Sequence, residues 1–572
     1  MVGSTSRGGT RRGPERYLPL AYFALAIAVV ALILPSALRP PAQQSNQSSE
    51  LSPNAPHQNQ QSIIAALSEA NSGTNGAGAG TGPASAQSQG PPPATASSPT
   101  SGPPSFCPFG VGDPPLQFNS PYAPPCAPAY TGRNPGSTYH GVSATTVKIA
   151  VADDTGATFS SNGPVADQPT AAENSAERFF TDMQIFLNHT FQFWGRSLQL
   201  IADTQGSGAN GDTKAEVAAA KDYQVFGAVG YTPPFCPEAV HDAMPNFCRV
   251  AVYPLPVYQQ DQPYLYSWWM NETLQDQFLA ESVCSNLVGR RAEWAGAGIQ
   301  GKVRKFGLIY SEGAQFPVDG NDILADLKST CGLVPAVSVG YDINQNDPNG
   351  SQALADAVVK FQANGVTTVI DEMDYVAGIE VTDQANSSGY VPEWYMDGAS
   401  GIDRNQLAAL MNQAEWSHAF GLTNDEMEIP PADWACYQVI QEVDPGFSPN
   451  QTLCTYHFES LVQMAAGIQA AGPDLTPATL ERGLIRNGYK FYSRPAWPAG
   501  GGFGPDDPTY IKNAAEIWWN PGATNPVTGD PTGAYEYLDG GARYRLGQLP
   551  PGERPYFSQG STVPAGGYSG SW

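Results

Sequence analysis

Short apolar runs alternate with amphipathic stretches along the part of the chain that follows residue 142. The run Val147-Lys-Ile-Ala-Val-Ala-Asp-Asp154 is typical of a buried parallel strand that ends in polar residues. The stretch 171–192 repeats large apolar residues at spacings of three and four, which predicts an amphipathic helix. These two patterns recur many times, so the body of the chain is expected to alternate strands with helices.

The remaining elements follow from the same patterns. Further strands are expected at 196–202, 225–231, 249–253, 264–269, 304–310, 336–341 and 367–371. Further helices are expected at 214–223, 274–295, 319–330, 352–364, 433–442, 457–471 and 477–487. Because the series begins anew at residue 304, we expect an α/β fold with two Rossmann-like lobes, each built on a parallel sheet. Two late strand-like pieces, 516–519 and 534–538, are expected to close over these lobes.

An uncharged apolar segment spans Tyr17 to Leu38. As a helix it is about 33 Å long, enough to cross the ~30 Å hydrocarbon core of a membrane. Arginines precede the segment, so residues 1–16 are expected to be a cytoplasmic basic tail, with the body outside the cytoplasm. A cleaved signal peptide is the alternative, but Arg39-Pro40-Pro41 follows the segment where an Ala-x-Ala site would be needed. We therefore expect an uncleaved single-span anchor at 17–38.

Residues 40–140 are dominated by Pro, Gln, Ser, Gly, Ala and Asn and carry neither the strand nor the helix period. Such a composition buries too little apolar surface to fold alone, so this segment is expected to be a disordered linker. The formal net charge of the chain is −25, which would repel a polyphosphate. Nucleic acid is therefore excluded as a partner.

The eight cysteines all follow the apolar segment, on the side expected to be oxidising. Sequence cannot choose among their many pairings, but pairing in order of sequence closes only short or moderate loops. The expected disulfides are Cys107–Cys126, Cys236–Cys248, Cys284–Cys331 and Cys436–Cys454. A zinc site would need CxxC knuckles or clustered histidines, and neither is present in the sequence. We expect no metal and no cofactor.

Several strings in the body resemble those of a known family. They are Val147-Lys-Ile-Ala-Val151, Leu198-Gln-Leu-Ile-Ala-Asp-Thr-Gln205, Lys305-Phe-Gly-Leu-Ile-Tyr-Ser-Glu-Gly313, Val366-Thr-Thr-Val-Ile-Asp371 and Asn386-Ser-Ser-Gly-Tyr-Val-Pro-Glu-Trp394. Their order is similar to that in extracytoplasmic substrate-binding proteins of branched-chain amino-acid (Leu/Ile/Val) ABC importers, which have the type I periplasmic-binding-protein fold. The resemblance covers roughly residues 142 to 550. The chain departs from the family in lacking a lipid-modified cysteine after its apolar segment.

The resemblance implies two lobes joined by three crossovers, which clamp a small ligand between them. On this basis lobe 1 is expected to comprise 142–268 and 424–500. Lobe 2 is expected to comprise 269–423 and 501–548, and 549–572 to be a flexible tail. The crevice beyond the strand ends of such sheets suits a small solute, because helix N-termini supply free N–H groups there. ABC-importer membrane subunits are the partners that the resemblance implies.

The resemblance also points to candidate ligand-binding residues. They are Tyr231, Thr232, Tyr253, Leu255, Tyr310, Glu372 and Asp374. Glu372 and Asp374 belong to the acidic run Asp371-Glu372-Met373-Asp374 and could pair with the ammonium group of an amino acid. Each residue also has a structural interpretation: an aromatic side chain at a strand end is often part of the core, and an acidic run often caps a helix.

The expected function is non-catalytic capture of an amino acid or similar polar metabolite for import. H-E-x-x-H, G-x-S-x-G and P-loop motifs are all missing from the sequence, so no catalytic residue is expected. A G-x-G-x-x-G match at 206–211 is flanked by Asp203 and Asp212, which disfavour a pyrophosphate. Two alternatives remain: an extracellular ligand sensor with the same fold, and an anchored hydrolase that uses paired carboxylates.

Overall fold

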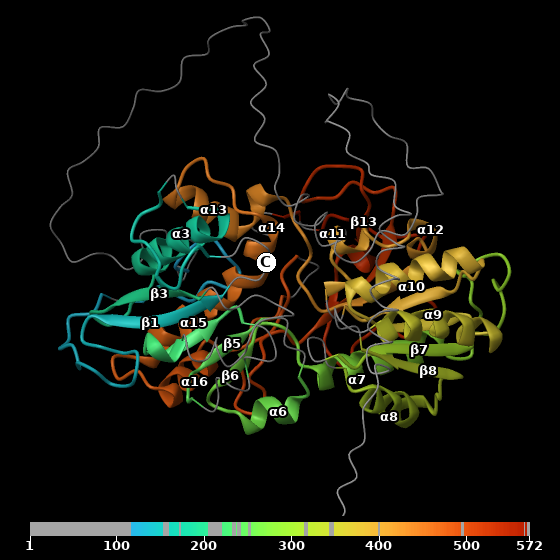
Figure 1. The fold of residues 1–572 in the computed structure, drawn as a ribbon, viewed down its shortest axis with the longest axis horizontal. Helices are drawn as coiled ribbons and strands as arrows, with labels where there is room; N and C mark the ends of the chain where they lie inside the picture. Colours follow the sequence, from blue (N-terminus) through green and yellow to red (C-terminus); the bar gives the residue numbers. More distant parts are fainter. Residues whose placement is uncertain are drawn as a thin grey trace, which may run out of the picture. The chain divides into compact units, whose positions relative to one another are not determined.

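The computed structural model describes residues 116–568 except 128, 153–158, 171–172, 204–219, 232–235, 237–241, 250–252, 314–317, 343–347, 399–400, 493–496 and 566. All of them belong to one compact unit, Ile64–Trp572. They form two β-sheets with helices packed on them (Figure 1). The expected anchor at 17–38 lies outside the described residues. Within the described ranges, no helix combines the length and the apolar character needed to cross a membrane.

The first sheet has the strand order β2-β3-β1-β4-β5-β6. Its strands are β1 (Thr146–Ala152), β2 (Gly163–Pro164), β3 (Ser197–Asp203), β4 (Gly227–Val229), β5 (Asn246–Cys248) and β6 (Leu265–Ser267). All neighbours are parallel except β2, which pairs antiparallel with β3 at the edge. The centre of the sheet is buried on both faces, which explains the continuous apolar runs in β1 and β3.

The second sheet has the order β13-β12-β11-β10-β9-β7-β8, with β14 paired to β12. Its strands are β7 (Phe306–Ser311), β8 (Val337–Tyr341), β9 (Thr368–Glu372), β10 (Glu393–Met396), β11 (Ala419–Thr423), β12 (Ala514–Asn520), β13 (Ala534–Tyr537) and β14 (Arg543–Tyr544). The first five are parallel, whereas β12, β13 and β14 are antiparallel to their neighbours. The late strand-like pieces therefore extend this sheet.

The parallel strands of the two sheets follow the same order. Numbered along the chain, β3-β1-β4-β5-β6 and β8-β7-β9-β10-β11 both read 2-1-3-4-5. This is the order of doubly wound α/β sheets, in which the chain reverses its direction of travel between the first and third strands. The expectation of two parallel-sheet α/β halves is confirmed.

The helices also come in chain order. With the first sheet the chain forms α3 (Ser175–Thr190) and α6 (Leu255–Gln260). With the second it forms α7 (Glu272–Ser282), α8 (Gly320–Cys331), α9 (Pro348–Ala363), α10 (Tyr375–Ser388), α11 (Asn405–Ala408) and α12 (Gln413–Trp416). The last are α13 (Ala435–Val443), α14 (Gln451–Leu453), α15 (Glu459–Ala471) and α16 (Pro477–Arg486). Local sequence sets several ends: Asn174 and Glu177 form a capping box on α3, and α10 stops at left-handed Gly389.

The chain passes three times between the two sheets. After β11, helices α13 and α15 return to the first half, where α13 contacts α3 and Gln469 of α15 accepts a hydrogen bond from Gln192 N–H (Figure 1). Residue Thr509 then bridges Ser267 of β6 before β12 enters the second sheet. Residues 501–511 thus lie against the first sheet, so the third crossover falls later than the expected boundary at residue 501.

Part of the expected linker is folded. Residues 116–127 and 129–140 are described, and Phe118 and Tyr122 are each only 2% exposed. Phe118 lies edge-on to Phe186 of α3, with ring centroids 5.2 Å apart. The Tyr122 ring lies 4.7 Å from Trp268, and its hydroxyl accepts a hydrogen bond from Ala499 N–H. The expectation of disorder to residue 140 was wrong, because two isolated aromatics anchor a segment without any hydrophobic period.

Residues 549–565 and 567–568, which belong to the expected flexible tail, are also packed on the body. Tyr556 is buried against Phe420 of β11, with ring centroids 4.8 Å apart. Ser561 bridges Tyr537 of β13, and Gln559 C=O accepts a hydrogen bond from Trp518. Gly and Pro in this segment break any periodic signal, which explains why its packing was missed.

Several other elements differ from expectation or lie outside the described residues. The strand expected at 249–253 lies mostly outside the described residues; the described strand before it is β5, Asn246–Cys248, and α6 begins at Leu255 after the N-cap residue Pro254. The helix expected at 274–295 begins at Glu272, passes into a π-helical turn and ends near residue 287, before Gly289 at φ +77°. Strand β10, strand β11 and helix α10 were not predicted. The helix expected at 214–223 lies mostly outside the described residues.

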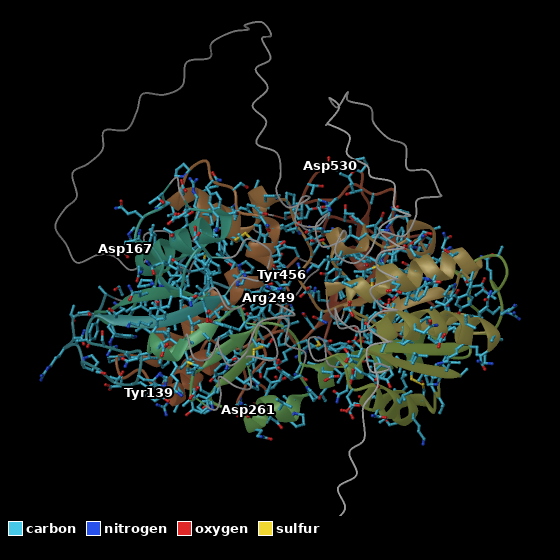
Figure 2. All side chains as sticks on the ribbon, in the orientation of Figure 1. Tyr139, Asp167, Arg249, Asp261, Tyr456 and Asp530 are labelled. Atoms are coloured by element: carbon cyan, nitrogen blue, oxygen red, sulfur yellow. A yellow bond between two sulfur atoms is a disulfide. The ribbon has the colours of Figure 1, made fainter. Side chains whose placement is uncertain are left out.

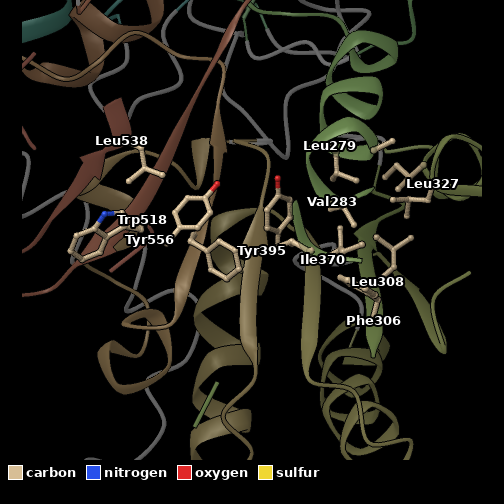
Figure 3. Close-up of a cluster of buried hydrophobic side chains, with 14 residues drawn as sticks. Leu279, Val283, Phe306, Leu308, Leu327, Ile370, Tyr395, Trp518, Leu538 and Tyr556 are labelled. Atoms are coloured by element: carbon tan, nitrogen blue, oxygen red, sulfur yellow. The ribbon is translucent and has the colours of Figure 1, made fainter. Parts of the chain in front are cut away.

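Disulfides stabilise each described half from within, and one large apolar cluster stabilises the second. The described disulfides are Cys236–Cys248, Cys284–Cys331 and Cys436–Cys454, which are the pairs expected from sequence. Cys126 is also disulfide-bonded, and its expected partner Cys107 lies outside the described residues. On the second sheet, side chains from β7, β9 and β10 pack against α7 and α8; they include Leu279, Val283, Leu308, Leu327, Ile370 and Tyr395 (Figure 3).

Candidate functional site

The strand order of the two sheets indicates where a ligand site is expected. In doubly wound sheets, ligands bind beyond the carboxyl ends of the strands at the point where the strand order reverses. That point lies between β1 and β4 in the first sheet and between β7 and β9 in the second. The residues that follow these strands, and the helix N-termini beside them, are therefore the first candidates.

Three of the predicted residues have structural roles in the first half. Tyr231 is buried in a cluster with Ala150 and Ile201, and its hydroxyl donates a 2.8 Å hydrogen bond to Asp203. Tyr253 packs beside the Cys236–Cys248 disulfide, with its ring 6.0 Å from that of Tyr258. Leu255 begins α6, where its N–H donates to Thr273 Oγ1. Thr232 lies outside the described residues.

The three predicted residues of the second half differ in how their side chains are used. Tyr310 is partly buried against α8, where its ring occupies the space left by Gly320. Asp374 caps α10 by accepting from Val376 and Ala377 N–H, and it also accepts from the Tyr341 hydroxyl. Glu372, at the end of β9, is buried; its carboxyl group interacts with Asp397, and its Oε1 atom has no hydrogen-bond partner among the described residues. One oxygen of Glu372 is thus unpaired there, whereas Asp374 is committed to its helix cap.

An aromatic–arginine group lies close by, formed by Arg249, Trp269, Tyr375 and Tyr456. The Arg249 guanidinium lies 4.4 Å from the centre of the Tyr456 ring, and Figure 2 shows these two side chains together. Trp269 lies 6.1 Å from the same ring, between centroids. Tyr375 begins α10 of the second half; burial and the nearby Tyr456 raise its pKa to about 12, and Arg249 opposes that rise. The group therefore joins residues that are carried by both sheets.

An acidic group completes the site, formed by Glu272 and Asp276 of α7, Glu372 of β9 and Asp397 after β10. All four are buried. Helix α7 lies near the carboxyl end of β9, because Asp276 of α7 acts electrostatically on Glu372. Burial raises the pKa of Glu272 to about 8, and burial with neighbouring Asp397 raises that of Glu372 well above its usual range.

A buried ionic network ties the second crossover to the second half. Arg404, which precedes α11, is 2.7 Å from Asp425. Glu428 accepts a hydrogen bond from Asn405 N–H, and Asp403 accepts one from Thr423. Burial opposes the charge on Arg404, but the carboxylates of Asp425, Glu428 and Asp403 outweigh it and raise the pKa of Arg404. This network fixes the crossover that carries the chain back towards Tyr456.

Sequence reasoning missed most of these residues. Arg249, Trp269 and Tyr456 lie in short connections whose proximity depends on the crossovers, and Tyr375 was overlooked because α10 was not predicted. Glu272 and Asp276 carried a usable signal: two buried acids four residues apart on one helix face, directly after a crossover. In the described ranges no cluster of His, Cys, Asp or Glu is arranged to hold a metal ion.

The raised carboxyl pKa values predict a pH dependence of stability. Asp371 and Glu272 both have folded pKa values of about 8, raised by burial from 3.8 and 4.5. The folded state therefore holds more protons than the unfolded state between these limits, so stability falls as pH rises from about 4.5 to about 8. We expect a slope of about 1.4 kcal/mol per pH unit for each group.

Urea unfolding between about pH 5 and pH 8.5 measures this dependence. The double variant Glu272→Gln/Asp371→Asn should show a flatter profile, whereas Glu293→Gln, which alters an exposed acid, should not. Stability that rises with pH across this window would contradict the assignment.

Solved structures with a similar fold come from transporter substrate-binding proteins. The branched-chain amino acid transporter substrate-binding protein of Streptococcus pneumoniae, in complex with isoleucine, is 11% identical at a TM-score of 0.45, over 69% of this chain and 99% of that chain. The Leu-, Ile-, Val-, Thr- and Ala-binding protein of Brucella ovis is 12% identical at 0.47, over 71% and 98%. A solute-binding protein of an ABC transporter from Rhodopseudomonas palustris, in complex with 3,4-dihydroxybenzoic acid, is 12% identical at 0.47, over 70% and 97%.

No protein-family model and no curated protein matches the chain. A periplasmic binding protein type 1 from Bordetella pertussis is 11% identical at a TM-score of 0.45, over 69% of this chain and 99% of that chain.

Proposed function

We propose that the chain is a membrane-anchored, extracytoplasmic solute-binding protein that captures a small polar metabolite and does not transform it. One observation carries the proposal: Tyr456, beside the first sheet, approaches the second half, because a Cβ atom at Gly401 would lie 3.7 Å from its hydroxyl, and Tyr375 of the second half acts electrostatically on Tyr456 and Arg249. Side chains carried by two sheets of identical strand order are thus near one another, and such sheets bind ligands at the carboxyl ends of their strands. A site of which each sheet carries one half suits a protein that captures its ligand when the two halves close on it.

The two halves would act as lobes. Lobe 1 comprises 142–268 with 424–511, and lobe 2 comprises 269–423 with 512–568. A ligand that touches both lobes binds the closed state more tightly than the open state, and so shifts the population towards closure. The three crossovers are the positions where the backbone would bend.

We propose a separate role for each side chain that would contact the ligand. Arg249 would hold a carboxylate, because a guanidinium is suited to bidentate pairing. Glu372 would accept from an ammonium group, with Tyr310 and the rings of Tyr375 and Tyr456 against the rest of the solute. This site matches an amino acid or a related polar metabolite.

The N-terminal region would set the location. Residues 17–38 would anchor the chain, and the segment up to residue 115 would give the body reach above the membrane. Membrane subunits of an ABC importer are the partner that we propose.

Isothermal titration of the full-length chain in detergent with amino acids and small organic acids tests the function. We expect one solute bound per chain, recovered unchanged, and at least about 10-fold weaker binding after Tyr456→Ala, the loss of about 1.4 kcal/mol. Tyr489→Ala, at a tyrosine that is 53% exposed, is the matched control and should bind as tightly as the wild type. Chemical conversion of the solute, or no binding across the panel, would contradict the proposal.

A further inference from the structure

The acidic group defined above brings four buried carboxyl groups together, and burial with mutual repulsion raises the pKa values of Glu272, Asp276 and Glu372, so that a bound cation is needed to favour their ionised form. Glu272, Asp276, Glu372 and Asp397 come from α7, β9 and the segment after β10, and each is at most 3% exposed. The charged groups that act most on Glu372 are Asp397, Asp276 and Asp371, all of them acids. Those that act on Asp276 are also acids. For Glu372 and Asp276, the strongest of these influences all come from acids and none comes from a Lys, Arg or His side chain.

Two of the carboxylates also have oxygen atoms without hydrogen-bond partners among the described residues. These atoms are Glu372 Oε1 and Asp276 Oδ2, both buried. By sequence, the loop segments 314–317, 343–347 and 399–400 after β7, β8 and β10 contain no Lys, Arg or His. A buried polar atom that lacks a partner is costly, and a buried charge without a counter-charge is more costly still. Such atoms at a ligand-binding edge indicate a partner supplied from outside the chain.

The chemistry of that partner follows from what surrounds the oxygens. A metal ion is disfavoured, since the described acids are not arranged to hold one. An organic ammonium group fits, because it donates several hydrogen bonds and neutralises charge. The aromatic–arginine group is close along the chain: Tyr375 lies three residues after Glu372, and Trp269 three before Glu272. Aromatic faces attract cations and pack against alkyl chains.

We propose that the solute is an organic cation with net positive charge, whose ammonium group binds between Glu372 and Asp276. This inference rests on the proposed function and narrows it. A zwitterion such as leucine carries one ammonium and one carboxylate, which leaves the acidic group largely unbalanced. A basic amino acid or a diamine supplies the additional positive charge. A basic amino acid differs from a diamine in one respect: only the amino acid has a carboxylate that could pair with Arg249.

Calorimetric titration of the full-length chain at about pH 7.5 tests the inference with four probes: putrescine, L-lysine, L-leucine and benzoate. We expect putrescine or L-lysine to bind at least about 10-fold more tightly than L-leucine or benzoate. Glu372→Gln and Asp276→Asn should each weaken that binding about 10-fold or more, whereas Glu293→Gln, at an exposed acid, should leave it unchanged. Arg249→Met should weaken the binding of L-lysine but not the binding of putrescine.

The possible results separate the two claims. Binding of leucine or benzoate without binding of either cation would overturn the inference and leave the proposed function standing. Cation binding that is equal in Glu372→Gln, Asp276→Asn and Glu293→Gln would also overturn it, because the cation would then bind elsewhere. Binding of none of the four probes would contradict the inference and count against the function as well. Thermal melting verifies that each variant is folded. The Gln and Asn side chains have nearly the same shape as the carboxyl groups they replace, so these substitutions remove only the charge.

Discussion

Replacing Arg304 with methionine is expected to lower the free energy of unfolding by about 3–5 kcal/mol, because it leaves a buried carboxylate without its counter-charge. Arg304 Nε and an Nη of the same guanidinium donate to the two oxygens of Glu393, at 2.7 and 2.9 Å. Both side chains are buried: 2% of Arg304 and 0% of Glu393 is exposed. The guanidinium also lies 5.0 Å from the centre of the Trp294 ring. The pair joins the segment before β7 to β10, at the middle of the second sheet.

Urea unfolding of the wild type and of Arg304→Met measures this loss. Lys302→Met, two residues earlier and exposed, is the matched control and should change stability by about 0.5 kcal/mol or less. The double variant Arg304→Met/Glu393→Met should recover part of the loss, because it removes both charges. If Arg304→Met were no less stable than Lys302→Met, the pair would have no role in holding β10.

Replacing Tyr122 with alanine is expected to cost about 3–5 kcal/mol, the range for emptying a buried aromatic site. Its ring lies 4.7 Å from Trp268, 6.2 Å from Trp497 and 5.9 Å from Tyr510, between centroids. Trp268 and Tyr510 adjoin the first and third crossovers, and Glu426 of the second also interacts with Tyr122. Loss of this ring removes the contact that all three crossovers share.

Tyr122→Phe separates the ring from the hydroxyl. It should cost only about 1–2 kcal/mol, since it loses the hydrogen bond from Ala499 N–H but keeps the packing. Circular-dichroism melting of both variants checks the order. Equal stability of the wild type and Tyr122→Ala would mean that the segment around residue 122 is not part of the folded body.

The sequence predicted the α/β class and most strands because parallel, doubly buried strands produce continuous apolar runs such as those of β1 and β7. It failed where order depends on distant contacts. The segment that contains Phe118 and Tyr122 has no periodic pattern of its own, and it is folded only because helices and crossovers far along the chain surround its two rings. The same explanation applies to Tyr556 near the C-terminus.

The site was only partly predictable for a related reason. Glu372 could be named because it ends a strand, and strand ends lie at the ligand edge of such sheets. Asp374 looked equivalent in sequence, but its position before α10 makes it a helix cap. Arg249 and Tyr456 are about two hundred residues apart in sequence and meet only because the second crossover returns the chain to the first half. No local pattern contains that information.

Hydrogen exchange tests the central claim, that two lobes share one ligand. Exchange is followed by mass spectrometry on the full-length chain, with and without the tightest-binding solute of the titrations. Closure predicts that bound solute slows exchange in both lobes, because it stabilises both. The protected peptides should be those around Tyr456 on the first lobe and those around Glu372 to Tyr375 on the second. Protection confined to peptides of a single lobe would contradict a shared site.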